Sequence, residues 1–187
     1  NVAVGYTALQ GNDVGQWNVA VGRGALTTMA NPTSTNSYNV AVGGLALGAL
    51  TTGIYNTAVG GLSGDALTTG GSNTSVGYLS LSSVTTGTGN TVMGREAGEA
   101  LTGSNNVAIG YRSLHNQTSG TNTAVGTFSL NNNTTGTSNT GVGYNAITSN
   151  TTGDFNTAVG HGTLDANTTA SYNTALGYNA LTATTTG

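Results

Sequence analysis

Two histidines, His115 and His161, are the side chains of this sequence best suited to acid–base chemistry near neutral pH. A catalytic site needs more than a histidine, because a nucleophile must lie beside a base that a third group orients. The sequence has no cysteine, no P-loop and no dinucleotide-binding fingerprint between a strand and a helix. We therefore predict no catalytic residues, no metal ligands and no cofactor, and we expect that the chain is not an enzyme.

Charged side chains are few and scattered along the 187 residues. The chain has three arginines, no lysine and six acidic residues, which give a net charge of −3. A nucleic acid or an anionic membrane surface requires a run of basic side chains. No apolar run approaches the roughly 18 residues of a membrane-spanning helix. We expect no nucleic-acid partner and no membrane insertion.

The elements that must position any functional side chain are internal repeats of about 17 residues. Each repeat opens on the pattern Asn-x-small-apolar-Gly, and its residues are numbered below as positions from that Asn. Eleven repeats, called coils 1 to 11, form one array over 1–187 and begin at residues 1, 18, 39, 56, 73, 90, 106, 122, 139, 156 and 173. The one spacing of 21 residues predicts a loop insertion within 29–38, around Pro32.

Aligned in columns, the repeats keep one residue type at each of several positions. Position 1 is Asn and position 5 is Gly in all eleven repeats, position 3 is small in nearly all, and position 4 is a medium-sized apolar residue. Position 8 is Ala, Ser or Thr, position 9 is mostly Leu or Ile, and a polar turn such as Thr134-Thr135-Gly136 follows. Frequent Gly and β-branched residues disfavour a helix. We predict a short strand over positions 1–4, a Gly corner, and a second short strand through positions 8 and 9.

The fold that accommodates these columns is all-β: a parallel β-solenoid, or β-roll, with one repeat in each of eleven coils. Coils stack about 4.8 Å apart, which gives a rod of roughly 50 Å. The position 1 Asn side chains are expected to form a ladder that bonds each amide to the coils above and below. Positions 3 and 4 face opposite sides of the strand, and we expect both sides to be buried. Because one thin coil buries little apolar area, we predict that position 3 or 4 packs against identical chains.

Aromatic residues gather in two columns that form a candidate recognition surface. Position 6 holds five of the eight tyrosines, and the residue directly before the next Asn, called position 17, holds the other three. Flat aromatic faces suit sugar rings, whereas the alternative is that the rings stack between coils and at subunit boundaries. The candidate residues are Tyr6, Tyr78, Tyr111, Tyr144, Tyr178, Trp17, Tyr38, Tyr55, Phe155 and Tyr172.

A solenoid also fixes which polar side chains can meet. Glu99 and His115 share position 10 in adjacent coils, which predicts a surface pair about 4.8 Å apart. Arg23, Arg95 and His161 share position 6, but each lies four coils from the next, so they do not converge within one chain. Only a three-fold assembly would bring copies of His161 together.

The opening of each repeat resembles the head repeat of YadA-type trimeric autotransporter adhesins. The resemblance rests on Asn1–Gly5, Asn106–Gly110 and Asn156–Gly160, and on the small residue at position 8. The longer repeat that ends in Thr-Thr-Gly is similar to repeats of phage-type tail-fibre proteins and of large secreted bacterial proteins. The resemblance implies a trimeric, left-handed β-roll that acts as an adhesive or spacer element. The repeat is a few residues longer than that of the adhesin heads, so a lone solenoid or a head-to-tail filament stays open beside the homotrimer.

These observations favour an extracellular structural or adhesive fibre or filament segment without catalysis, at a cell surface or on a virion tail. Its expected partners are further copies of itself, as a homotrimer or a head-to-tail filament, and cell-surface glycans or extracellular matrix. The alternatives are a glycan-binding receptor-recognition segment of a phage tail fibre and an ice-binding solenoid. Ice binding requires Thr on a flat strand face, whereas the Thr pairs lie mostly beside the turn glycines.

Overall fold

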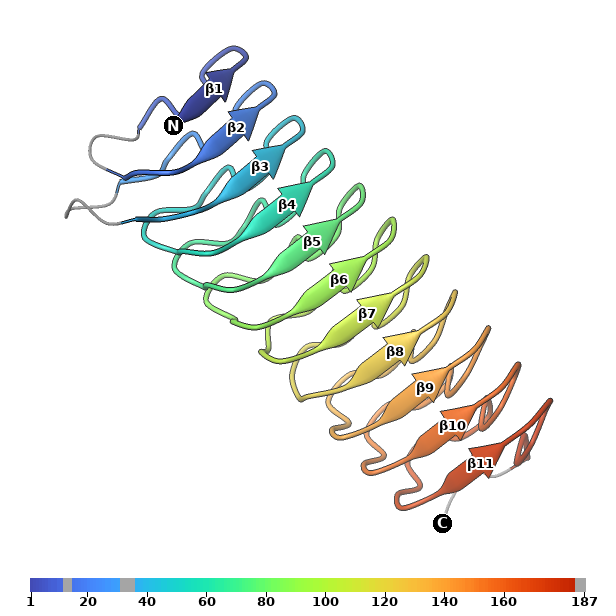
Figure 1. Cartoon of the computed structure of the whole chain (residues 1–187). Coiled ribbons are helices and arrows are strands. Elements are labelled where there is room, and N and C mark those ends of the chain that lie inside the picture. Colours follow the sequence, from blue (N-terminus) through green and yellow to red (C-terminus); the bar gives the residue numbers. More distant parts are fainter. Residues whose placement is uncertain (12–14, 31–35, 184–187) are drawn as a thin grey trace.

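The computed structural model describes residues 1–11, 15–30 and 36–183 and shows an all-β chain wound into a rod (Figure 1). Eleven parallel strands form one sheet in sequence order and stack along the axis of the rod. The strands are β1 (Val2–Val4), β2 (Val19–Val21), β3 (Val40–Val42), β4 (Thr57–Val59), β5 (Thr74–Val76), β6 (Thr91–Met93), β7 (Val107–Ile109), β8 (Thr123–Val125), β9 (Thr140–Val142), β10 (Thr157–Val159) and β11 (Thr174–Leu176). The predicted parallel β-solenoid is confirmed.

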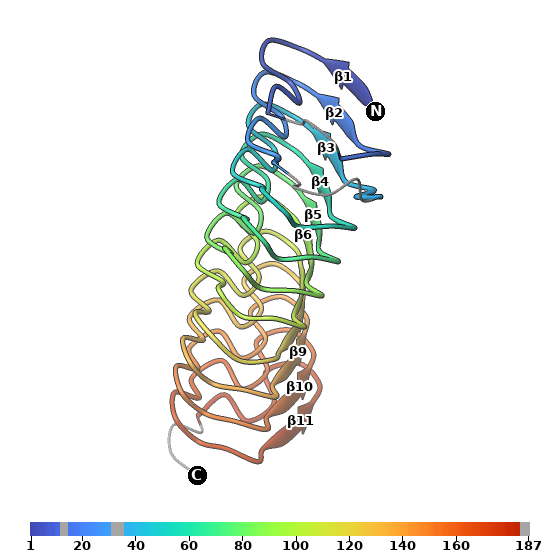
Figure 2. The ribbon, with the colours of Figure 1, turned by 90° about the vertical axis from the view of Figure 1, so that its left-hand side faces the viewer.

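Each strand pairs in register with the strand of the next coil. Ala3 pairs with Ala20, and Ala20 pairs with Ala41. Figure 2, turned by 90°, shows that the remainder of each repeat closes a loop behind its strand and that these loops stack along the rod. A residue type that recurs at a fixed position of the sequence therefore forms a column along the rod.

The Gly of position 5 ends each strand and turns the chain. Its φ lies between 122° and 139° in all eleven coils, a region that residues with a Cβ rarely adopt. A Cβ at Gly5 would also lie 2.6 Å from the carbonyl oxygen of Gly22 in the next coil. Both the backbone conformation and the close approach of neighbouring coils therefore require Gly at this position.

The prediction of a second strand through positions 8 and 9 is wrong. Positions 7 and 9 adopt left-handed conformations, as at Leu45 (φ 60°) and Leu47 (φ 48°), so this segment forms a tight turn. Neighbouring coils still bond to one another here, because the Leu47 N–H donates to the Ser63 carbonyl at 3.0 Å and the Leu114 N–H donates to the Ser129 carbonyl at 3.1 Å. This ladder and the burial of the Leu side chain offset a conformational cost of about 1 to 2 kcal/mol per residue.

The ladder of position 1 Asn side chains is confirmed. At all ten junctions between coils, the side-chain oxygen of one Asn accepts a hydrogen bond of 2.8 to 3.0 Å from the backbone N–H of the next Asn. The Asn56 side-chain nitrogen donates to Asn39 Oδ1 at 3.2 Å and to the Gly70 carbonyl of its own turn at 2.9 Å. The ladder therefore joins strand, turn and neighbouring coil through amides that are buried in coils 2 to 10, and only Asn18 Nδ2 among the described ladder amides is buried without a partner.

The core is a narrow set of columns from positions 3, 8, 9 and 12. Position 3 lies fully inside, as at Ala20, Ala58 and Ala108. The predicted alternation across the strand is confirmed, but the expectation that both sides are buried is wrong for the single chain. Position 4 points outward together with position 2, and the side chains of Val59 and Met93 remain 37% and 40% exposed.

The loop predicted within 29–38 falls partly on residues 31–35, which lie outside the described residues. Of its flanks, Met29 is buried at position 12, and the Ser37 N–H donates to the Gln16 carbonyl at 3.0 Å. Across the part of the chain that the structure describes, no helix has the length and apolarity needed to cross a membrane.

Candidate recognition surface

The outer side of the sheet presents one face, called the strand face below, which consists of the position 2 and position 4 residues of β1 to β11. Position 4 gives an unbroken column of Val, Ile, Met and Leu side chains that are half-buried or exposed. Position 2 is Val or Thr in every coil, and no charged residue interrupts either column. The strand face is therefore an apolar strip, partly lined with hydroxyl groups, that runs along the rod.

The aromatic residues of position 17 lie two residues before the strands begin and form two separate stacks. Trp17, Tyr38 and Tyr55 stack with ring centroids 6.3 and 5.8 Å apart and interplanar angles of 9° and 14°. Phe155 and Tyr172 stack at 5.1 Å and 9°. All five residues have φ between 48° and 62°. The left-handed backbone of this position is therefore compatible with large aromatic side chains.

Position 6 carries another stack, beyond the Gly corner that ends each strand. Tyr144, His161 and Tyr178 stack with centroids 5.1 Å apart and interplanar angles of 24°. Phe128 belongs to neither sequence column, yet it packs edge-on against Tyr111 at 5.3 Å and against Tyr144 at 6.3 Å. The stack therefore extends over coils 7 to 11, and Phe128 joins it from position 7.

Stacking decides which ring faces a ligand can reach. Tyr38 and His161 each lie between two other rings, so both of their faces are covered. Tyr6 and Tyr78 make no ring contact with another described residue, and their side chains are 77% and 50% exposed. The ten candidate residues do not form one uniform strip: stacking between coils covers the inner rings and leaves ring faces open where a stack ends.

A charged cluster lies next to Tyr111 in coils 6 and 7. The buried carboxylate of Glu96 pairs with Arg95 (Nη2 to Oε1, 2.6 Å) and with Arg112 (Nε to Oε2, 2.5 Å). The hydrogen bond from Arg112, followed by that from Arg95, lowers the pKa of Glu96, and the bond to Glu96 raises the pKa of Arg112. Both guanidinium groups lie over the Tyr111 ring, 5.6 and 5.4 Å from its centroid. The cluster is an ion-pair network that joins two adjacent coils.

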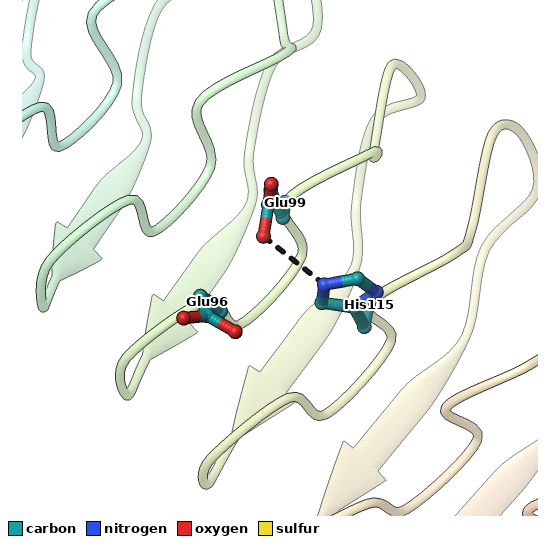
Figure 3. Close-up of side chains that lie close together, drawn as sticks. All are labelled: Glu96, Glu99 and His115. Carbon is teal, nitrogen blue, oxygen red and sulfur yellow. Dashed lines mark hydrogen bonds and ion pairs between the residues drawn. The ribbon is translucent and has the colours of Figure 1, made fainter.

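The predicted contact between Glu99 and His115 is confirmed, and Figure 3 shows the two side chains meeting across adjacent coils. His115 Nε2 lies 3.0 Å from Glu99 Oε2, and its Nδ1 lies 3.0 Å from Asn116 Oδ1. One ligand atom from each of Glu96, Glu99 and His115 falls within 4.8 Å of the others. Both oxygens of Glu96 are bound by guanidinium groups, however, so a cation there would have to displace positive charge. The arrangement suits ion pairing better than cation binding.

Asp65 is a second carboxylate with a shifted pKa, and it lies elsewhere on the rod. It lines a groove over coils 2 to 4 together with Thr27, Leu45 and Ala49. Its Oδ1 atom is buried and has no hydrogen-bond partner among the described residues. Burial raises the pKa of Asp65. Ionisation of this carboxylate therefore opposes folding, in contrast to ionisation of Glu96.

Three features of the surface escaped the sequence analysis. Glu96 and Arg112 share position 7 in adjacent coils, so the column comparison that paired Glu99 with His115 would also have found this pair. Phe128 lies at position 7, one position away from the tyrosine column, so the two aromatic columns did not include it. The Thr residues of position 2 were not separated from the Thr pairs of the turns, although only the former lie on the strand face.

The chain matches no protein-family model, no curated protein and no solved structure. Its function must therefore be inferred from the rod, the strand face and the aromatic stacks.

Proposed function

We propose that this chain is a segment of an extracellular structural or adhesive fibre, without catalysis, in which each rod associates with further copies of itself. Repeated coils supply length, and the surface is built from Asn, Thr, Ser and Gly rather than from charge. The resemblance to adhesin heads and tail fibres supports a trimer and a location at a cell surface or on a virion tail.

The observation that carries the proposal is the strand face. Monomeric soluble proteins rarely expose large contiguous apolar patches. The position 4 column continues through every coil and includes the exposed side chains of Val59, Met93 and Val159. Copies that pack these columns together would bury the strip along the whole rod. Such contact would add apolar burial to a coil whose own core is only a few side chains wide.

Val125→Asp tests the strand face, because it adds a charge to the position 4 column without changing the inward-facing position 3. We expect the wild-type protein to sediment as a homo-oligomer at micromolar concentration and Val125→Asp to shift it toward the monomer. Thr152→Asp is the matched control, since Thr152 is exposed in a turn away from the strand. A folded wild-type monomer, or equal dissociation of both variants, would overturn the proposal.

Ice binding is the second candidate, and one feature of the strand face favours it. Seven of the eleven position 2 residues are Thr, in register from coil to coil beside the apolar column. They are Thr57, Thr74, Thr91, Thr123, Thr140, Thr157 and Thr174. The objection that Thr lies mostly beside turn glycines does not apply to this column.

A pair of tyrosine substitutions separates ice binding from self-association. Thr140→Tyr disrupts the regular strand face, whereas Thr152→Tyr places the same ring in the turn of the same coil. Inhibition of ice recrystallisation that is lost in Thr140→Tyr alone would favour ice binding. Wild-type protein without any inhibition of ice recrystallisation would exclude ice binding and favour the fibre proposal.

A further inference from the structure

The N-terminal aromatic stack of position 17 ends at Tyr55, and a small side chain takes the place of the next ring. One face of Tyr55 is covered by Tyr38, whose ring centroid lies 5.8 Å away. In the next coil the same position is Ser72, and hydrogen bonds between the backbones of adjacent coils align Ser72 with Tyr55. The Tyr55 N–H donates to the Ser37 carbonyl at 2.8 Å, and the Ser72 N–H donates to the Ile54 carbonyl at 3.0 Å. The second face of Tyr55 is therefore directed along the rod, above Ser72.

This second face is accessible. Tyr55 is 54% exposed as a residue, and its ring contacts no other ring of the described chain on that side. Ser72 and the next residue of the column, Gly89, are both exposed and small. A flat ring placed above Ser72 would lie about one coil spacing, roughly 4.8 Å, from the Tyr55 ring. The stack therefore has room for one more ring, which no described residue of this chain supplies.

The surroundings of the open face are neutral and rich in hydroxyl groups. Ser72 and Thr74 carry hydroxyls close to it in sequence, and both side chains reach the surface. Asp65 is the only Asp, Glu, Lys, Arg or His within residues 39–72, and it lines the separate groove at position 10. A pyranose offers a flat C–H face to an aromatic ring and hydroxyl groups at its rim. An apolar wall with a few polar groups is the usual composition of a site for such a molecule.

We infer that the open face of Tyr55, above Ser72, binds one neutral pyranose ring of a glycan. The inference deepens the adhesive part of the proposed function and rests on it. A single stacked sugar binds weakly, and adhesion then requires many copies of the site along a fibre, which raise the avidity.

The other position 17 stack provides a contrasting ring face. Phe155 has Tyr172 on one side, and on the other side the preceding coil places Ser138. The carboxylate of Asp154 lies beside this face, because it accepts a hydrogen bond from the Thr137 N–H at 2.6 Å. A negative charge next to the ring makes Phe155 the poorer match for a neutral sugar.

Ser72→Tyr closes the proposed site and preserves the backbone. Ser72 has φ 59°, whereas Tyr38 and Tyr55 hold aromatic side chains at 48° and 61° in the same column. The new ring would occupy the place of the ligand. Binding can be followed by fluorine NMR on protein that contains fluorotyrosine, with the Tyr55 signal assigned from Tyr55→Phe. The probes are the methyl pyranosides of glucose, galactose and mannose.

We expect a saturable shift of the Tyr55 signal with at least one of these pyranosides and roughly tenfold or more weaker binding in Ser72→Tyr. Ser83→Tyr adds a ring at an exposed position of another column and should bind like the wild type. Three results would overturn the inference: no saturable shift with any of the sugars, a shift that Ser72→Tyr leaves unchanged, or a stronger response to benzyl alcohol than to the sugars.

Sedimentation of the same samples separates this inference from the fibre proposal. Ser72→Tyr should keep the wild-type association state, because Ser72 belongs to neither column of the strand face. If the wild-type protein associates but binds no sugar, the sugar site is contradicted and the fibre proposal stands. If the wild-type protein is a monomer that binds the sugar, the assembly proposal is contradicted and the sugar site stands.

Discussion

The two halves of the rod share one backbone but differ in what fills position 12. In coils 2 to 6 this position is apolar and fully buried, as Met29, Leu50, Leu67, Val84 and Leu101. In coils 7 to 10 it is an equally buried amide, as Gln117, Asn133, Asn150 and Asn167. Strands keep the same in-register pairing in both halves. One position of this core therefore accepts either hydrophobic or hydrogen-bonded filling.

The amides of coils 7 to 10 form a second ladder beside the position 1 Asn ladder. The Asn150 side-chain nitrogen donates to Asn133 Oδ1 at 2.6 Å and to the Gly153 carbonyl at 2.9 Å. The Gly153 carbonyl also accepts a hydrogen bond from the Asn139 side chain at 2.8 Å. In coils 8 to 10, two side chains from opposite parts of the coil thus donate to the same turn carbonyl.

The two kinds of filling carry different costs. In the apolar half, the Gly70 carbonyl accepts its side-chain hydrogen bond from Asn56, and Leu67 fills the remaining space. In the amide half, the ladder is satisfied in its middle, but Gln117 Nε2 and Asn167 Oδ1 have no partner among the described residues. A buried polar atom without a partner is destabilising. The amide half therefore gains side-chain hydrogen bonds. Its unpaired polar atoms lie at the two ends of the ladder, at Gln117 and Asn167.

The largest expected effect should be the same in both halves. Gly77 and Gly143 both have φ 137°, and a Cβ at either would clash with the Gly carbonyl of the next coil. We expect Gly77→Ala and Gly143→Ala each to cost about 3 kcal/mol or more. Hydrogen exchange of amides in the substituted coil measures this loss. Clearly unequal losses would show that the halves differ in backbone as well as in filling.

Exchanging the fillings should give the next largest effect, and an asymmetric one. Leu67→Asn places an amide oxygen without a donor between apolar neighbours and loses apolar burial, which should cost about 3 to 5 kcal/mol. Asn150→Leu loses three side-chain hydrogen bonds, with Asn133, Gly153 and Asn167, but adds apolar volume, and should cost about 1 to 2 kcal/mol. Local hydrogen exchange again measures both. Equal costs would contradict the distinction between the halves.

Acid should act on the apolar half through two carboxylates with opposite effects, Glu96 in coil 6 and Asp65 in coil 4. The folded pKa of Glu96 is lowered, chiefly by its hydrogen bond to Arg112, so its ion pairs contribute stability that is fully present above the unfolded pKa of about 4.3. That stability disappears as pH falls through the lower folded pKa. The melting temperature of Glu96→Gln should therefore lie below that of the wild type at neutral pH. The two melting temperatures should approach each other in strong acid.

Asp65 provides the control of opposite sign for this pH dependence. Its folded pKa is raised by burial, so ionisation destabilises the fold as pH rises. Asp65→Asn should melt higher than the wild type at neutral pH and converge with it in acid. Identical pH profiles of the two variants would contradict the assigned directions.

The smallest effect is expected at Gln117, where the two halves meet. Its Oε1 accepts a hydrogen bond from Asn122 at 3.1 Å and another from Asn133, and both of those side chains also bond the Gly136 carbonyl. Gln117→Leu removes the unpaired Nε2 and extends the apolar column by one coil. The change in stability should lie within about 1 kcal/mol of zero. A loss of stability as large as that of Asn150→Leu would show that the second ladder requires the Gln117 amide at its start.

The sequence predicted the features that repeat in every coil. Identical residues at one position stack directly, so Gly5 and its equivalents marked the corner, and Asn1 and its equivalents marked the ladder. The left-handed conformation of Leu47 could not be predicted in this way, because Leu rarely adopts positive φ outside a stack that bonds its backbone on both sides. Position 12 was missed since Leu50 and Asn133 share a column but not a residue type.

The surface was predicted less completely than the core. The aromatic columns were identified, but the open face of Tyr55 depends on a gap at Ser72 rather than on the aromatic residues themselves. Alternation in the strands implied two buried sides, whereas one chain buries only position 3, and position 4 needs a partner to be covered. The trimer and its left-handed winding stay predictions from the resemblance.

A single engineered thiol tests most directly whether the strand face is a contact between copies. The chain has no cysteine, so Val125→Cys would carry its only thiol, and any disulfide must join two chains. A disulfide requires Cα atoms within about 7 Å, which only packed position 4 columns would supply. We predict that mild oxidation converts Val125→Cys into covalent dimers, whereas Ser83→Cys, exposed in a turn, stays largely uncoupled. An uncoupled Val125→Cys, or equal coupling of both variants, would contradict the account.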